Sequence, residues 1–188
     1  VLLNGKPLNC RTPHDAIVNG VVMVPEDRKL QGIIPRMSVG RNISIGSLDQ
    51  ITNRLGIVNT RREEQIGLDG KANFNIKTPN LEKPIVELSG GNQQKAIVAR
   101  WMSTKPEVLI LDEPTKGIDV GAKSEFYNMI CEFAKEGLAV ILISSELPEV
   151  IGLSDRIIVM RGRRIVGEIS AKDATEEKLL SMAMMEET

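Results

Sequence analysis

The sequence predicts an α/β fold in which helices cover a mostly parallel sheet. Three short runs of apolar residues have the pattern of buried strands: Val21–Val24, Val108–Leu111 and Ala139–Ile143. Between the last two, Gly121–Glu136 carries apolar residues at the spacing of one helix face. Apolar strands that alternate with helices are typical of a parallel sheet with helices on its faces.

The elements around the first strand differ in character. Val1–Leu8 predicts two short strand pieces around an Asn-Gly pair, because that pair is a favoured hairpin turn. Residues 37–86 lack strand-like runs and carry scattered glycine and asparagine, so we expect a helical insertion with loops. A helix is expected over Asn92–Met102, because its apolar residues share one face.

The chain beyond the third strand predicts a further set of short elements. A short helix around Leu147–Ile151 precedes two strands, Arg156–Met160 and Arg164–Ile169, joined by an Arg-Gly turn. A last helix is expected over roughly Glu176–Met185.

The composition excludes several classes of protein. The 188 residues suit one globular domain, and the net charge of -1 gives no field that would attract nucleic acid. The longest apolar runs are too short to span a bilayer. Cys10 and Cys131 lie far apart, which argues against a disulfide framework or a cysteine zinc site and fits a reducing compartment. The single histidine, His14, excludes a multi-histidine metal centre.

Two consecutive carboxylates, Asp112 and Glu113, follow the second buried strand. In a nucleotide hydrolase one such carboxylate supports Mg²⁺, and its neighbour orients or deprotonates the attacking water. The same residues also fit a buried strand that simply ends in an acidic turn. The pair alone does not decide between these interpretations.

A second candidate motif is the run Leu88–Lys95, which reads Leu-Ser-Gly-Gly-Asn-Gln-Gln-Lys. Its glycines allow a ligand to approach the backbone, and Ser89 offers a hydroxyl. The helix that follows presents free N–H groups, which favour a phosphate. A Ser-Gly-Gly turn that only caps the helix is the alternative interpretation.

Taken together, these motifs closely resemble the nucleotide-binding domains of ABC transporters. The matches are the signature motif (Leu88–Gln94), the Walker B strand with its glutamate (Val108–Glu113) and the D-loop (Gly117–Asp119). Within that family, four runs resemble the second half of the tandem ATPases of bacterial monosaccharide importers, of the ribose, galactose, arabinose and xylose type. These runs are Pro25–Lys29, Ser89–Lys95, Gly117–Lys123 and Ser144–Glu149.

The resemblance implies an ABC-type P-loop NTPase fold whose N-terminal phosphate-loop part is missing. The sequence contains no G-x-x-x-x-G-K-[ST] loop, and its only Gly-Lys pairs are Gly5-Lys6 and Gly70-Lys71. We therefore expect a truncated domain that is inactive as an ATPase by itself. Residues 1–36 and 96–188 would form the α/β core lobe. Residues 37–95 would form the helical subdomain that bears the signature motif.

The resemblance also implies a role for each candidate site residue. In the family two nucleotide-binding domains close face to face with ATP and Mg²⁺ between them. Ser89, Gly90 and Gly91 would touch the γ-phosphate of ATP held by the partner domain. Asp112 would support the metal, Glu113 would position water, and Asp119 would link the two sites. The remaining candidates are Asn92 and Gln93 in the signature motif, Glu26 at the position of the family's glutamine, and Ser145 at that of its switch histidine.

The implied partners are those of an importer: the other nucleotide-binding half of the same polypeptide, integral membrane permease subunits, and a periplasmic or lipoprotein sugar-binding protein. No nucleic acid is expected. The implied location is peripheral, on the cytoplasmic face of the bacterial inner membrane. Nothing in this sequence identifies the sugar, because the binding protein and the permease select it.

Two other functions share part of this pattern. Chromosome-maintenance and repair ATPase heads carry a similar signature, but they insert a long coiled coil, and residues 37–86 show no sustained heptad. A degenerate ABC domain with a regulatory role is the second alternative. The intact Asp112-Glu113 pair argues against it, whereas serine at position 145 argues for it.

Overall fold

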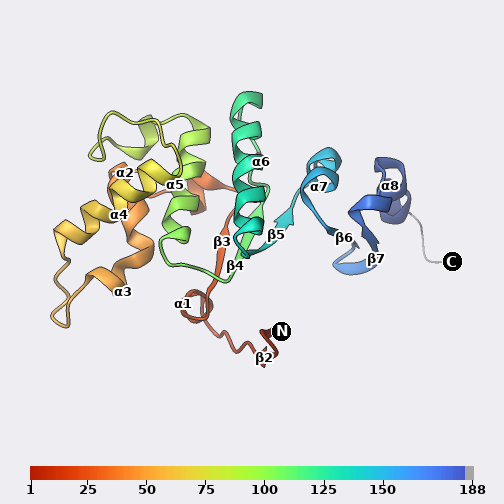
Figure 1. Cartoon of the computed structure of the whole chain (residues 1–188), viewed down its shortest axis with the longest axis horizontal. Coiled ribbons are helices and arrows are strands. Elements are labelled where there is room, and N and C mark those ends of the chain that lie inside the picture. Colours follow the sequence, from red (N-terminus) through yellow and green to blue (C-terminus); the bar gives the residue numbers. More distant parts are fainter. Residues whose placement is uncertain (185–188) are drawn as a thin grey trace. The chain divides into compact units, whose positions relative to one another are not determined.

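The computed structural model describes residues 1–184 (Figure 1). The chain forms two compact units, residues 1–141 and residues 142 onward, and each is described by itself. In residues 1–184, no helix combines the length and the apolar composition needed to cross a bilayer.

The first unit begins with the predicted hairpin. Strands β1 (Leu2–Leu3) and β2 (Lys6–Pro7) pair antiparallel around Asn4 and Gly5, which both have positive φ angles as a tight hairpin turn requires. Helix α1 (Pro13–Val18) follows and was not predicted. Its N-terminus has a capping box, in which Thr12 and Asp15 bond to each other's backbone.

The central sheet has the strand order β3-β4-β5. Strand β3 (Val21–Val24) pairs parallel with β4 (Val108–Asp112), and β5 is Ala139–Ile143. The parallel pairing confirms the predicted sheet. The side chains of Val22, Val24, Leu109 and Leu111 are at most 2% exposed, so the sheet contributes its inward face to the core.

The segment between β3 and β4 is helical, as predicted. It contains η1 (Arg28–Gly32), α2 (Val39–Ser44), η2 (Ile45–Ser47), α3 (Leu48–Ile51), α4 (Thr60–Asn73), η3 (Ile85–Glu87) and α5 (Gly90–Met102). Helices α2, α4 and α5 pack side by side (Figure 1). A Cβ at Gly70 would lie only 2.7 Å from Ile43, so glycine permits this close approach. The proposed subdomain of residues 37–95 stays a prediction.

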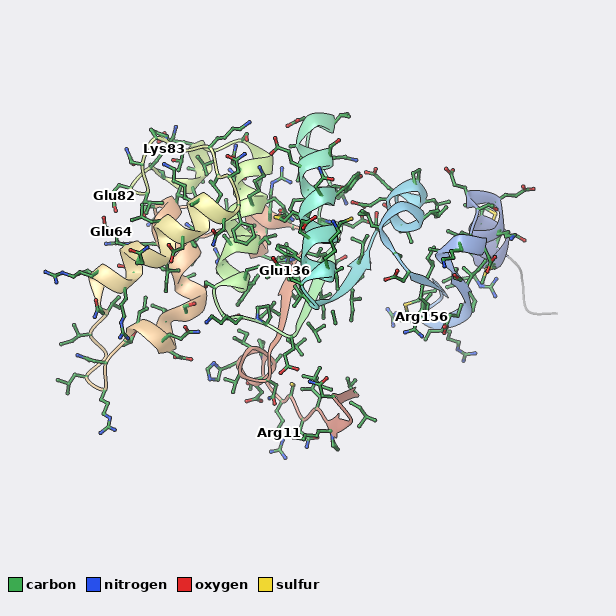
Figure 2. The ribbon with its side chains drawn as sticks, viewed as in Figure 1. Arg11, Glu64, Glu82, Lys83, Glu136 and Arg156 are labelled. Carbon is green, nitrogen blue, oxygen red and sulfur yellow. The ribbon has the colours of Figure 1, made fainter. Side chains whose placement is uncertain are left out.

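Several charged side chains of the first unit lie on its outside. Glu64 and Glu82 are exposed and extend from the ribbon, as does Arg11 beside the N-terminal hairpin (Figure 2).

Helix α6 (Val120–Lys135) follows β4 and packs through one apolar face. Phe126, Ile130 and Phe133 on that face are at most 7% exposed. The ring of Phe133 lies against Phe74 at the end of α4, with ring centroids 6.0 Å apart. The predicted helix Gly121–Glu136 is thus confirmed, and both of its ends lie one residue earlier than predicted.

The second unit contains the remaining predicted elements. Helix α7 (Leu147–Leu153) precedes the antiparallel strands β6 (Arg156–Arg161) and β7 (Arg164–Ser170). A short 3₁₀ turn, η4 (Ala171–Asp173), leads to α8 (Glu176–Met184). These elements confirm the sequence prediction, except that Met185 lies outside the described residues.

Candidate functional site

The end of β4 brings Asp112 and Glu113 to the edge of the sheet. Glu113 has a φ of 45°, a left-handed backbone that costs a residue with a side chain roughly 1 kcal/mol. The pKa of Asp112 is raised by burial and, secondly, by the nearby carboxylates of Glu26 and Glu113. Strain and crowded negative charge are therefore concentrated at this strand end, as often occurs at functional sites.

Glu26 lies beside this strand end and has a basic partner. Its carboxylate accepts a bond of 2.5 Å from Nζ of Lys116, and this contact raises the pKa of the lysine. The pair is 49% and 63% exposed, so its contribution to stability is small. Lys116 was not among the predicted site residues.

Ser89 stands at the start of α5 as its N-cap but forms no side-chain bond to the helix backbone. Its Oγ instead accepts a bond of 2.9 Å from the side-chain amide of Asn92. Asn92 in turn accepts a bond of 2.8 Å from the backbone N–H of Lys77. The exposed Ser89 hydroxyl is thus oriented by Asn92, and its own proton remains able to donate.

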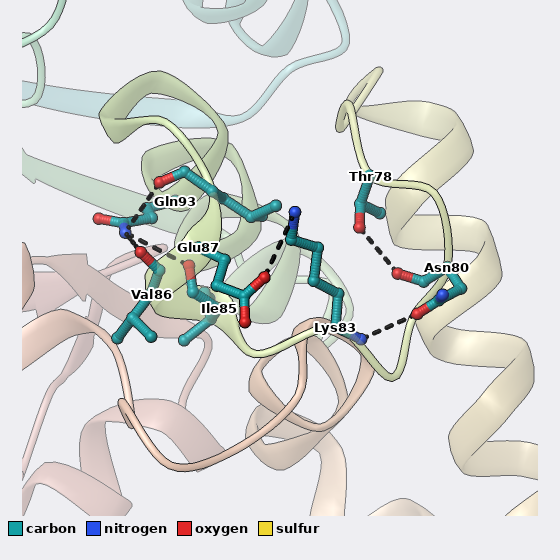
Figure 3. A network of polar contacts seen from close by, with 8 residues as sticks. Thr78, Asn80, Lys83, Ile85, Val86, Glu87 and Gln93 are labelled. Carbon is teal, nitrogen blue, oxygen red and sulfur yellow. Dashed lines mark hydrogen bonds and ion pairs between the residues drawn. The ribbon is translucent and has the colours of Figure 1, made fainter.

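Gln93 is only 6% exposed and holds the turn that leads into the signature motif. Its side-chain amide donates to three backbone carbonyls, those of Ile85, Val86 and Leu88 (Figure 3). The preceding loop has its own bonds: Asn80 accepts from the N–H of Lys83, and Lys83 pairs with Glu87 at 3.5 Å. In this structure the bonds made by Gln93 therefore orient the backbone before Ser89.

The glycines of the signature motif contact the D-loop and α6 of the same chain. A Cβ at Gly90 would lie 3.4 Å from the carbonyl oxygen of Gly117. A Cβ at Gly91 would lie 3.0 Å from the Cβ of Ala122. Asp119 is exposed and caps α6 by accepting a bond of 3.0 Å from the N–H of Ala122. The structure thus brings the signature glycines to the D-loop and the start of α6.

Two basic side chains on α5 secure that helix. Nζ of Lys95 is 2.5 Å from the carboxylate of Glu125 on α6, which lowers the pKa of Glu125. Arg100 is 6% exposed and donates to the carbonyls of Gly32 and Asn42 at 2.7 and 2.6 Å. Burial lowers the pKa of Arg100 to about 10. No role for either residue was predicted.

Ser145 belongs to the second unit, where it follows β5 and is exposed. Beside it, Ser144 bonds to the buried carboxylate of Glu149 and accepts a bond of 3.0 Å from the N–H of Glu146. These contacts fix the turn that presents Ser145.

No group of three or more potential metal ligands occurs in the described part of the chain. That finding is compatible with Mg²⁺, which often binds through one or two carboxylates and is completed by phosphates and water. Asp112 fits such a Mg²⁺ site. Burial and neighbouring carboxylates raise its pKa, and a nearby cation would favour the charged carboxylate.

Comparison with known proteins places this arrangement in a family. Residues 1–116 match the family model described as ABC transporter. The chain belongs to the ABC transporter family. The arabinose import ATP-binding protein AraG of Mannheimia succiniciproducens is 53% identical over 184 residues, which are 98% of this chain and 37% of that protein. Yersinia pestis AraG is 51% identical over 98% of this chain and 35% of its own length.

Other ABC proteins agree with this membership. A Rhizobium etli ATP-binding protein named for ribose/galactose/methyl galactoside import is 47% identical over 97% of this chain and 35% of its own length. The chain thus spans little more than a third of these curated relatives.

Solved ABC structures show the same fold. Clostridium perfringens cbiO1, part of the ABC transporter complex cbiONQ, aligns with a TM-score of 0.73 and 23% identity over 95% of this chain and 68% of its own. The ATP-binding cassette MJ0796, in a dimeric post-hydrolysis state bound to ADP and Pi, aligns at 0.72 with 16% identity over 90% of this chain and 72% of its own. The predicted ABC-type α/β fold is confirmed.

Proposed function

We propose that this chain is part of the ATP-binding and ATP-hydrolysing subunit of a bacterial ABC importer for a monosaccharide. The observation that carries the proposal is the contact between the signature glycines and the D-loop, next to a helix start that presents the Ser89 hydroxyl. The relatives named for arabinose and for ribose/galactose import support the solute class.

Each residue of the site would act on a different part of the nucleotide. Ser89, Gly90 and Gly91 would bind the γ-phosphate of ATP held by the other nucleotide-binding half, where N–H groups and a hydroxyl can donate. Asp112 would hold Mg²⁺, which offsets phosphate charge when bound. Glu113 would orient the attacking water by accepting its proton or a hydrogen bond.

Other predicted residues would support this site from a distance. Asn92 would orient the Ser89 hydroxyl, and Gln93 would orient the backbone before it, as their bonds suggest. Asp119, exposed at the D-loop, would link the two sites. Glu26 and Ser145 would take the positions of the family's glutamine and switch histidine.

The proposed partners follow from the importer function. They are the other nucleotide-binding half, permease subunits in the membrane and a sugar-binding protein outside it. The ATPase subunit would lie at the cytoplasmic face of the inner membrane. Closure of the two halves on ATP would move the permease subunits, and hydrolysis would reopen them.

The full-length protein with its permease subunits in liposomes provides the test. We expect ATP hydrolysis that increases when the sugar-loaded binding protein is added, together with sugar uptake. ATP hydrolysis without uptake of any of the four candidate sugars would contradict the importer function. Absence of hydrolysis, with the protein still altering the activity of another component, would support the regulatory alternative.

A further inference from the structure

Arg28 is the first residue of η1, close to Glu26, and its guanidinium reaches across to the D-loop. Its Nη1 donates to the carbonyl oxygen of Lys116 at 2.8 Å, and its Nη2 donates to that of Gly117 at 3.2 Å. These partners lie 88 and 89 positions further along the chain. One planar side chain thus fixes two successive carbonyls of a loop whose own backbone hydrogen bonds are those of tight turns.

The same guanidinium occupies the space above Gly90. A Cβ at Gly90 would lie 2.6 Å from Nη2 of Arg28 and 3.2 Å from its Cζ. The backbone at Gly90 is helical with no positive φ, so conformation alone does not demand glycine there. A methyl group there would force the end of the Arg28 side chain to shift away from its two carbonyl partners, with the carbonyl oxygen of Gly117 at 3.4 Å on the same side.

The charge of Arg28 has no carboxylate partner in the described part of the chain. Its Nε is buried without a hydrogen-bond partner. The side chain therefore depends on its two carbonyl bonds and on contact with Gly90. Arginine is suited to this position because its planar guanidinium supplies both donors, which a lysine could not do.

We propose that Arg28 is a positioning residue that joins the signature motif to the D-loop of the same chain. It keeps Gly117 against Gly90, so that Ser89 and Asp119 move together when the two halves close. The absence of a side chain at the first signature glycine then leaves room for Arg28, in addition to the approach of the phosphate that the proposed function places at this helix start. This inference rests on the proposed function of the signature motif.

The test combines Gly90→Ala and Gly91→Ala with Arg28→Ser in the full-length protein reconstituted with its permease subunits. In the wild-type background, Gly90→Ala pushes a methyl group onto the guanidinium and should lower kcat about tenfold. In the Arg28→Ser background that space is vacant, so the further loss should be less than about twofold. Gly91→Ala is the matched control: its Cβ meets Ala122, so its loss should be the same in both backgrounds.

Equal losses from Gly90→Ala in both backgrounds would overturn the proposal, because Gly90 would then be required by something other than Arg28. A loss in the double variant that is smaller than in Gly90→Ala alone would support it most strongly. The comparison of kcat with KM for ATP adds a second criterion. Misalignment of the signature motif with the D-loop should lower kcat more than it changes KM for ATP.

Hydrogen exchange without nucleotide provides a readout that does not depend on ATP hydrolysis. The N–H of Ile118 bonds to the carbonyl of Thr115 at 3.1 Å, within the loop that Arg28 holds. Arg28→Ser should accelerate exchange of this amide about tenfold, whereas the neighbouring Lys29→Gln should not. Unchanged exchange in Arg28→Ser would refute the positioning role. If the wild type hydrolyses no ATP, the proposed function fails, and exchange still decides the role of Arg28.

Discussion

At the scale of single residues, the end of β4 combines an unfavourable backbone conformation with repulsion between carboxylates. Glu113 has a left-handed backbone, and Asp112 is partly buried next to two other carboxylates. A site that holds a divalent cation beside phosphate gains from such negative charge only when the ligand is bound. The unliganded protein therefore has unfavourable charge here.

Removing one of these charges should stabilise the unliganded protein. The folded state raises the pKa of Asp112, so it favours the protonated form, and stability falls as pH rises through that raised pKa. At pH 7 Asp112→Asn should raise Tm by about 1 °C, because water screens much of the repulsion at this partly exposed site. Calorimetry of the nucleotide-free protein measures this.

Asp155→Asn provides the control, because Asp155 is exposed in the second unit. It should leave Tm unchanged. Below the usual pKa of aspartate, the gain from Asp112→Asn should disappear, since the wild-type carboxyl is then protonated. A lower Tm for Asp112→Asn at pH 7 would show that the carboxylate stabilises the unliganded fold.

At the scale of elements, helix α5 connects several parts of the first unit. Gln93 bonds to the turn before it, Lys95 pairs with Glu125 on α6, and Arg100 bonds to η1 and α2. The orientation of the signature motif at the start of α5 therefore depends on contacts along the whole helix.

Arg100 is the contact with the largest expected energetic effect. Arg100→Ala would leave the carbonyl oxygens of Gly32 and Asn42 without this donor in a buried region. The free energy of unfolding should fall by about 2–6 kcal/mol, because each of the two buried acceptors left without a donor costs about 1–3 kcal/mol. Urea titration of the full-length protein measures the loss. As a control, Arg41→Ala on the exposed side of α2 should change the free energy of unfolding by less than about 0.5 kcal/mol. A change as small as this for Arg100→Ala would contradict the role assigned to Arg100.

The strands and the long helices could be predicted from the sequence because apolar runs and helical periodicity are local signals. Val21–Val24 and Ala139–Ile143 match their strands residue for residue. Helix α5 begins two residues earlier than predicted, because two glycines at its start carry no hydrophobic signal. Helix α1 was missed because it is short and has no buried residue.

Part of the candidate site was also predictable, since the signature motif, the acidic pair and the D-loop are contiguous in sequence. The contacts that hold them together were not. Arg28 and Arg100 act on partners 88 and 68 positions away, and no local pattern reports such contacts. The only sequence signal for Arg28 was its place in the matched run Pro25–Lys29, which indicated no role.

At the scale of the whole molecule, the proposed importer has two composite sites, and we expect them to be unequal. In the proposed site Ser145 would take the position of the family's switch histidine, and one donor to the γ-phosphate is typically worth about 10²–10³-fold in rate. ATP held against Glu113 should therefore turn over slowly. Glu113→Gln should lower steady-state ATPase activity by a few-fold at most, whereas removal of the matching carboxylate in the other half should nearly abolish it. Equal losses would contradict the asymmetry.

The most direct measurement of the central claim uses Ser89→Arg in the full-length protein with its permease subunits. An arginine at this exposed N-cap would project into the space where the partner-held phosphate should lie. We predict that nucleotide binding, measured by calorimetry, stays near the wild-type value, while ATP hydrolysis and sugar uptake are lost. Ser181→Arg, at an exposed position of α8, should leave all three unchanged. Normal hydrolysis with normal uptake in Ser89→Arg would contradict the role of this helix start in the ATP site.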